Sequence, residues 1–295
     1  MATVRPRLLL ATLGSLIAFG GLGALDTGTA LPDSTSPDAI AYASFSSQAL
    51  GGTVHFSVSL PPSYYAHTTA RYPVIYFLHG LPAGPNAYKG IGWVVAALRR
   101  SNHEAIVIGA QGARHGDTDP EWLNWGSGRE WEKAVARELV SVVDSRYRTI
   151  ASREGRVLIG ISAGGYGAAL IGYHHPGIFS VFQSWSGYFE PTTPDGSKTL
   201  DLGSDQRNKH ANLHRLAPNL RKRLGNYLNS TYFSFFIGTH DSFLADNRQL
   251  NGELGKYDVP HTKFKTYQGE HSMSLWKEHA TAWIARALSL AASPG

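Results

Sequence analysis

The sequence contains no cysteine among its 295 residues. Disulfide bonds, thiolate metal sites and a cysteine nucleophile are therefore excluded, and the fold must be stabilised by its packed core. Charged residues are also scarce, at 17%, whereas apolar residues make up 42%, which is typical of a globular chain that buries a sizeable core. The sequence has no internal repeat or low-complexity tract, which excludes a solenoid and a long disordered linker.

Residues 1–30 have the layout of a secretory signal. Arg5 and Arg7 precede a stretch of apolar and small residues at 8–25, and residues 28–30 offer a small-residue cleavage site. An uncleaved membrane anchor is the alternative, because the stretch is about as long as a bilayer span requires. Its glycines make it weakly hydrophobic and favour cleavage. We expect a secreted or cell-envelope protein.

The net charge of +5 and a pI near 9.3 are compatible with a loose association with anionic envelope surfaces. Basic residues concentrate between Lys209 and Arg223, although a solvated helix face explains this pattern at least as well. No nucleic-acid-binding motif is present, so nucleic acid is not an expected partner.

Apolar runs alternate with helical patterns along most of the chain. The clearest helix is expected at 130–144 and the last at 275–291. This alternation predicts an α/β fold, with a mostly parallel central sheet and helices on both faces. Strands are expected at 54–60, 72–78, 105–109, 156–160, 179–185, 232–237 and 261–268.

No break in composition divides the chain after its N-terminal segment. Residues 31–40 are rich in Pro, Ser and Asp and read as a short connector. We expect residues 41–295 to form a single domain, in which 190–227 is the best candidate for a lid-like insertion.

The pattern G-x-S-x-G follows one of the expected strands, at Gly160, Ser162 and Gly164, and small residues open a helix behind it. This arrangement predicts a nucleophile elbow, a turn so tight that only glycine fits beside the serine. Ser162 is therefore the expected nucleophile, at the C-terminal end of a strand.

A serine hydroxyl needs a neighbouring base, usually a histidine that a carboxylate holds in the correct tautomer. Asp241 directly follows an expected strand and is the candidate acid, with Asp246 as its rival. His271 follows the next expected strand and is the candidate base. His240 and His279 are its nearest rivals, but the first precedes the acid in the chain and the second lies inside the last helix.

The oxyanion of an acyl-transfer intermediate needs two backbone N–H donors. Ala163, directly after the nucleophile, is expected to supply one of them. In the loop HGLP, Pro82 has no N–H, which leaves Leu81 and Gly80 as candidates, with Leu81 preferred. His79 is assigned no chemical role.

Three tryptophans cluster before and within the helix expected at 130–144. Trp122 and Trp125 are candidate substrate-binding residues that could line an acyl or aromatic pocket. Trp131 lies on the apolar stripe of the helix and is expected in the core.

Together these residues resemble the putative esterase family of α/β-hydrolases, which includes esterase D-type enzymes, feruloyl esterases and secreted mycolyltransferase antigens. The resemblance implies a triad of Ser162, Asp241 and His271, with the oxyanion hole at Leu81 and Ala163. The blocks that carry it are YPVIYFLHGL at 72–81, ARELVSVVDSRY at 136–147, GISAGG at 160–165, FFIGTHD at 235–241 and GEHSMSLW at 269–276.

The chain departs from parts of that family. Mycolyltransferases usually carry an aspartate where this chain has His79, and their acid is usually a glutamate. The esterase D-type enzymes that act on a glutathione thioester are cytoplasmic, which conflicts with the export signal.

The expected reaction is therefore hydrolysis of a carboxylic ester, from a small molecule or the cell envelope, through an acyl-serine intermediate. No metal or cofactor is required, and the sequence has no HExxH pattern. An acyltransferase that passes the acyl group to a sugar or alcohol is the alternative. A non-catalytic binding protein on the same fold is the alternative of another class.

Overall fold

The computed structural model describes residues 39–117, 120–193, 197–260 and 262–292. The expected signal at 1–30 and nearly all of the connector at 31–40 lie outside these residues. None of the helices in the described ranges combines the length and the apolar character needed to cross a bilayer.

An eight-stranded sheet runs through the described chain in the order β1-β2-β4-β3-β5-β6-β7-β8. The first two strands in this order are antiparallel to their neighbours, and all the others are parallel. This confirms the predicted fold class. The strands are β1 (Ala41–Ser47), β2 (Gly52–Ser59), β3 (Val74–Leu78), β4 (Ile106–Ala110), β5 (Arg156–Ile161), β6 (Val181–Trp185), β7 (Tyr232–Gly238) and β8 (Thr262–Tyr267).

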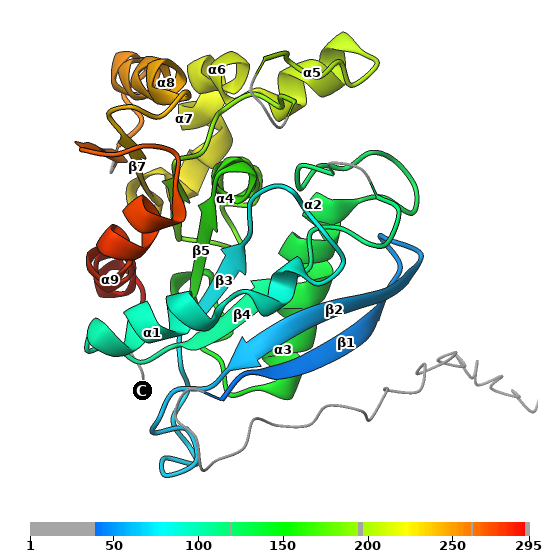
Figure 1. Ribbon diagram of the computed structural model, residues 1–295, viewed down its shortest axis with the longest axis vertical. Coiled ribbons are helices and arrows are strands. Elements are labelled where there is room, and N and C mark those ends of the chain that lie inside the picture. The colour runs from blue at the N-terminus through cyan, green and yellow to red at the C-terminus, as the bar shows by residue number, and fades with distance from the viewer. Residues whose placement is uncertain (1–38, 118–119, 194–196, 261, 293–295) are drawn as a thin grey trace, which may run out of the picture.

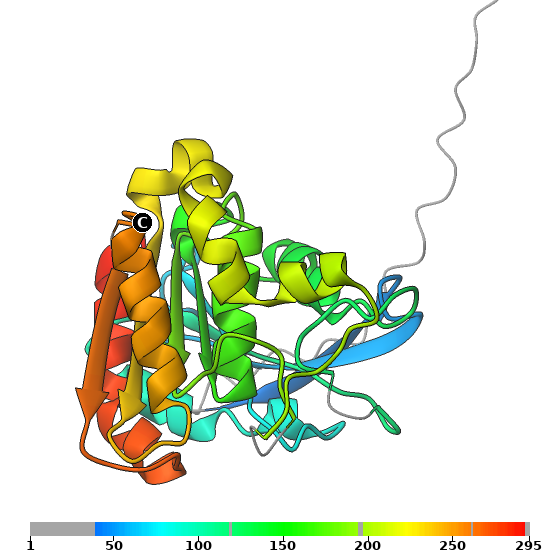
Figure 2. The same ribbon diagram turned by 90° about the horizontal axis from the view of Figure 1, so that it is seen from above.

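Helices cover both faces of the sheet (Figure 1). α1 packs against α9 on one face, and α4 packs on β5 and β6 on the other. Figure 2 shows α9 (red) on one side of the central green strands and α4 (green) on the other. The helices are α1 (Gly92–Arg100), α2 (Trp131–Lys133), α3 (Val140–Arg146), α4 (Ala163–His174), α5 (Asp205–Ala211), α6 (Leu213–Leu216), α7 (Leu220–Leu224), α8 (Leu244–Lys256) and α9 (Met273–Leu290).

The central strands are buried on both faces because helices cover both. Along β3, Ile75 and Phe77 join the core under α1 and α9, whereas Tyr76 and Leu78 join the core on the opposite face. This explains why the parallel strands read as continuous apolar runs. Trp131 lies in the core with 1% of its surface exposed, as predicted.

The sequence did not predict the strand β1 or the helices within 190–227. β1 was missed because its sequence AYASFSS carries small residues and a weak apolar alternation. It lies at the edge of the sheet and, among the described strands, pairs with β2 alone. The described part of 190–227 folds into α5, α6 and α7, with α6 against α8 and α7 against α4.

Candidate active site

Ser162 lies at the sharp turn between β5 and α4. Its backbone has φ 54° and ψ −124°, a strained conformation for a residue with a side chain. The flanking glycines make the turn feasible, because a β-carbon at Gly160 would collide with the carbonyl of Gly164, and one at Gly164 with the carbonyl of Leu78. The turn directs the Ser162 hydroxyl to the C-terminal edge of the sheet.

His271 and Asp241 lie in the loops that follow β8 and β7, the neighbouring strands at that edge. The Nε2 atom of His271 lies 2.9 Å from Ser162 Oγ, and its Nδ1 atom lies 2.8 Å from Asp241 Oδ2. Because the carboxylate accepts the Nδ1 proton, Nε2 is free to accept the proton of the serine hydroxyl. The structure thus brings the three predicted side chains into one hydrogen-bonded chain.

Both oxygens of Asp241 accept hydrogen bonds. Its side chain is fully buried, and Oδ1 accepts a hydrogen bond from the backbone N–H of Phe243 at 3.0 Å. The rings of Phe243 and Trp276 lie edge-on to the His271 imidazole, with centroids 5.5 Å and 5.1 Å away. The carboxylate and the two rings together fix the orientation of the imidazole.

The rival residues lie elsewhere. Asp246 Oδ1 lies 2.8 Å from His214 Nε2 instead of from His271. His279 stacks on Tyr267 with ring centroids 3.6 Å apart, and His240 contacts Thr239. None of these rivals has a hydrogen bond to Ser162 in the described structure.

The candidate oxyanion donors flank the serine. Ala163 follows Ser162 at the start of α4, and the loop with Gly80 and Leu81 lines the same cavity as the serine hydroxyl. Gly80 packs so closely that a β-carbon there would lie 2.9 Å from the β-carbon of Ser162. Leu81 and Ala163 thus both lie beside Ser162, as their predicted roles as oxyanion donors require.

His79 holds the loop that carries these donors. Its Nδ1–H donates to the Gly80 carbonyl at 2.9 Å, and its Nε2 accepts the Gly112 N–H at 3.1 Å. Burial lowers the pKa of His79, and the hydrogen bond to Gly80 only partly opposes this. A neutral His79 therefore bridges two loops, a positioning role that the sequence did not reveal.

A cavity of about 500 Å³ opens at Ser162. Its apolar wall includes three aromatic side chains, of Phe77, Trp93 and Trp276, together with Met273. Trp93 and Trp276 were missed from the sequence. Trp276 could have been found, because it closes the block GEHSMSLW that contains His271.

Trp122 and Trp125 do not line this cavity, which corrects their predicted role in substrate binding. Trp122 is 3% exposed, and its Nε1–H donates to the His79 carbonyl at 3.3 Å. Its ring fills the space beside Gly167. Trp125 donates to the Pro120 carbonyl at 2.8 Å and lines a different cavity, of about 420 Å³. Trp122 thus supports the His79 loop, and Trp125 is remote from Ser162.

The candidate lid also lies away from the serine. The residues that line the cavity around Ser162 come from β3 and the loop after it, from α1 and the elbow, and from the loop before α9 and the start of α9. The described residues of 190–227 instead line three other cavities, two of them shared with Trp125 and one beside Asn212.

Comparison with known proteins places the chain in a family. The family model described as "Putative esterase" matches residues 47–286. The chain belongs to this family. An esterase of Mycobacterium tuberculosis, Rv1288, is 26% identical over 147 residues, which is 50% of this chain and 32% of that protein. The chain thus spans about a third of the length of this relative.

Solved structures share the fold of this esterase-family protein. A ferulic acid esterase superposes with a TM-score of 0.72 at 20% identity, covering 86% of this chain and 98% of that one. The S-formylglutathione hydrolase FrmB of Staphylococcus aureus superposes with a TM-score of 0.66 at 20% identity, covering 85% and 97%. At such identities the likeness shows the fold.

Proposed function

We propose that this chain is an exported serine carboxylesterase that cleaves carboxylic esters through an acyl intermediate on Ser162. The observation that carries the proposal is the chain of two hydrogen bonds from Asp241 through His271 to the Ser162 hydroxyl. Membership of the esterase family supports the reaction class. Export rests on the signal-like layout of residues 1–30.

The first half-reaction forms the acyl-enzyme. His271 Nε2 takes the hydroxyl proton as Ser162 Oγ attacks the ester carbonyl, and the N–H groups of Leu81 and Ala163 stabilise the resulting oxyanion. As the tetrahedral intermediate collapses, the C–O bond to the alcohol breaks and His271 returns the proton to the leaving alkoxide. Asp241 stabilises the transient imidazolium throughout.

The second half-reaction releases the acid. His271 takes a proton from water, the hydroxide attacks the acyl carbonyl, and the Ser162 oxygen leaves with the proton that His271 gives back. An alcohol in place of water would yield a new ester by the same steps. Product analysis with added alcohols or sugars therefore separates hydrolysis from acyl transfer.

The cavity favours an uncharged substrate. Among the described residues that line it there is no Asp, Glu, Lys or Arg, and Trp93, Trp276 and Phe77 give it an aromatic wall. A charged acyl group would lose its hydration there without gaining an ionic partner. We therefore infer a neutral ester with an apolar acyl or alcohol part as the substrate.

The deciding experiment is turnover of short-chain p-nitrophenyl esters by the wild-type protein and by Ser162→Ala. Loss of the nucleophile should lower kcat by on the order of 10⁴-fold or more. A fluorophosphonate probe should label the wild type and leave the variant unlabelled. Equal turnover by the two proteins would exclude the mechanism. N-terminal sequencing of the exported protein tests the signal separately.

A further inference from the structure

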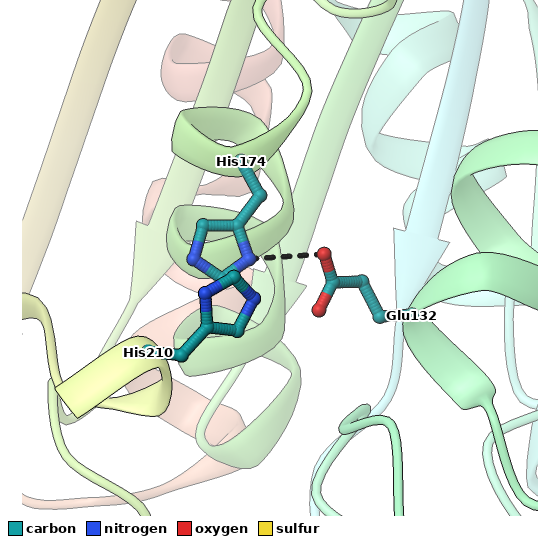
Figure 3. A group of neighbouring side chains, drawn as sticks. All are labelled: Glu132, His174 and His210. Carbon is teal, nitrogen blue, oxygen red and sulfur yellow. Dashed lines mark hydrogen bonds and ion pairs between the residues drawn. The ribbon is translucent and has the colours of Figure 1, made fainter. Parts of the chain in front are cut away.

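A second cluster of polar side chains lies at the end of α4 farthest from Ser162 (Figure 3). Glu132 from α2 is buried between two helices, and His174 Nδ1 and His175 Nε2 both lie within hydrogen-bonding distance of its Oε1, at 2.9 Å and 2.8 Å. His210 from α5 stacks on His174, with ring centroids 3.9 Å apart. Three separate helices thus meet at one carboxylate.

The nitrogen of His174 that could bind a metal is Nδ1. This atom faces the Glu132 carboxylate at 2.9 Å, on a side chain that is 1% exposed (Figure 3). The Nε2 atom lies on the other side of the ring, away from the carboxylate, and takes no part in the cluster. The His210 ring, stacked on that of His174, brings a second imidazole to the same carboxylate.

We propose that Glu132, His174 and His210 bind a divalent transition-metal ion of the zinc class, with His175 holding the carboxylate in place. Each of the three offers one ligand atom, and these atoms lie within 4.8 Å of one another. Two imidazole nitrogens and a carboxylate oxygen form a ligand set typical of Zn²⁺. The hydrogen bond that His175 makes to the carboxylate is a common support of such ligands.

Binding requires only a small adjustment. Zn–N bonds of about 2.0 Å place tetrahedral ligand atoms roughly 3.3 Å apart, so no pair of ligand atoms must close by more than about 1.5 Å. His210 can supply this movement because it is exposed and lies near the end of the short helix α5. The fourth position would be open to water from the cavity of about 420 Å³ that Glu132 and His210 line.

The proposed ion is structural. α4 has twelve residues, so its two ends lie about 18 Å apart, and the ion takes no part in the chemistry at Ser162. The bound ion would instead link α5 to α2 and α4 through its three ligands. The inference is independent of the proposed esterase activity.

The test is titration of the full chain, prepared without a polyhistidine tag and treated with a chelator, with Zn²⁺ alone in a calorimeter. We expect one Zn²⁺ per chain and a higher melting temperature in its presence. His210→Ala should weaken binding about a hundred-fold, and His210→Asp should recover part of it by offering an oxygen. His67→Ala, which removes another exposed histidine, should bind like the wild type.

His210 is the chosen position because its exposed side chain can be removed without opening the core, whereas loss of Glu132 or His174 could unfold the protein. Co²⁺ should give the visible absorption of a tetrahedral site in the wild type and lose it in His210→Ala. Absence of Zn²⁺ binding, or equal affinity in the wild type and His210→Ala, would overturn the site. Ester turnover should be the same in both proteins.

Discussion

Gly80 packs directly against Ser162: a β-carbon at Gly80 would lie 2.9 Å from the serine β-carbon and 3.2 Å from the Ile161 carbonyl oxygen. Real β-carbons do not approach so closely, so an added methyl group must push the loop and the elbow apart. The distance between the candidate oxyanion donors and the nucleophile therefore depends on the absence of one carbon atom.

The first prediction follows from this contact. Gly80→Ala should lower kcat/KM for p-nitrophenyl esters by on the order of 10²-fold, because displacements of about 1 Å at a reacting centre cost that much. Gly84→Ala, in the same loop but with open space around its β-carbon, is the matched control and should keep full activity. Similar rates for the two variants would contradict the predicted donor geometry.

A second prediction concerns the acid. Asp241→Asn keeps the shape of the side chain but favours the wrong tautomer of His271, so kcat should fall by roughly 10⁴-fold. Asp246→Asn removes the rival carboxylate, which contacts His214 instead, and should leave kcat within a few-fold of the wild type. If Asp246→Asn proved the more damaging change, the assignment of the acid would be wrong.

The cavity wall gives a third prediction. Trp93→Leu should enlarge the space beside Ser162 and shift the preference among p-nitrophenyl esters towards longer acyl chains. Trp125→Leu should not change that preference, because Trp125 lines a different cavity. The measurement is kcat/KM across a series of acyl lengths. An unchanged profile in Trp93→Leu would place the acyl chain elsewhere.

The fourth prediction concerns pH and stability. His214 lies 2.8 Å from both Asp246 and Glu253. Burial alone would lower the pKa of His214, but hydrogen bonds and charge from the two carboxylates raise it above its usual value. The stability from this imidazolium is therefore full below the unfolded pKa of about 6.5, and is lost as pH rises through the higher folded pKa.

The free energy of unfolding in urea should thus differ most between the wild type and His214→Gln at about pH 6, and the difference should shrink by about pH 9. The other histidines are present in both proteins, so the change of the difference with pH reports on His214. A difference that stays constant or grows with pH would show that His214 is not charged in the folded protein.

The sequence was sufficient to predict the fold and the site residues that follow the ends of the strands. In parallel sheets the C-terminal ends of all strands share one edge, so residues that follow β5, β7 and β8 must meet there. Ser162, Asp241 and His271 could be found in this way because their places depend on chain order and strand position. The direction of a loop side chain has no such constraint.

Trp122 illustrates the limit. Its backbone and that of Glu121 have positive φ values of 59° and 49°. Tryptophan and glutamate rarely adopt such conformations, so the sequence does not predict them. These angles turn the indole into the core, under His79, instead of into the cavity. The cluster at Glu132 was hidden for another reason: His174 and His210 lie 42 and 78 positions away in the chain, and only helix packing unites them.

The glycines of the elbow also bear on the order of folding. α4 contains four glycines in twelve residues, Gly164, Gly165, Gly167 and Gly172, and each disfavours an isolated helix by about 1 kcal/mol relative to alanine. The helix is stable only because β-strands and side chains such as Trp122 and Phe182 pack into the spaces the glycines leave. The turn that positions the nucleophile thus depends on the packing of α4 against the sheet. A collapsed but incompletely packed chain would have its strands and remain inert, so hydrolytic activity would report the final stage of folding.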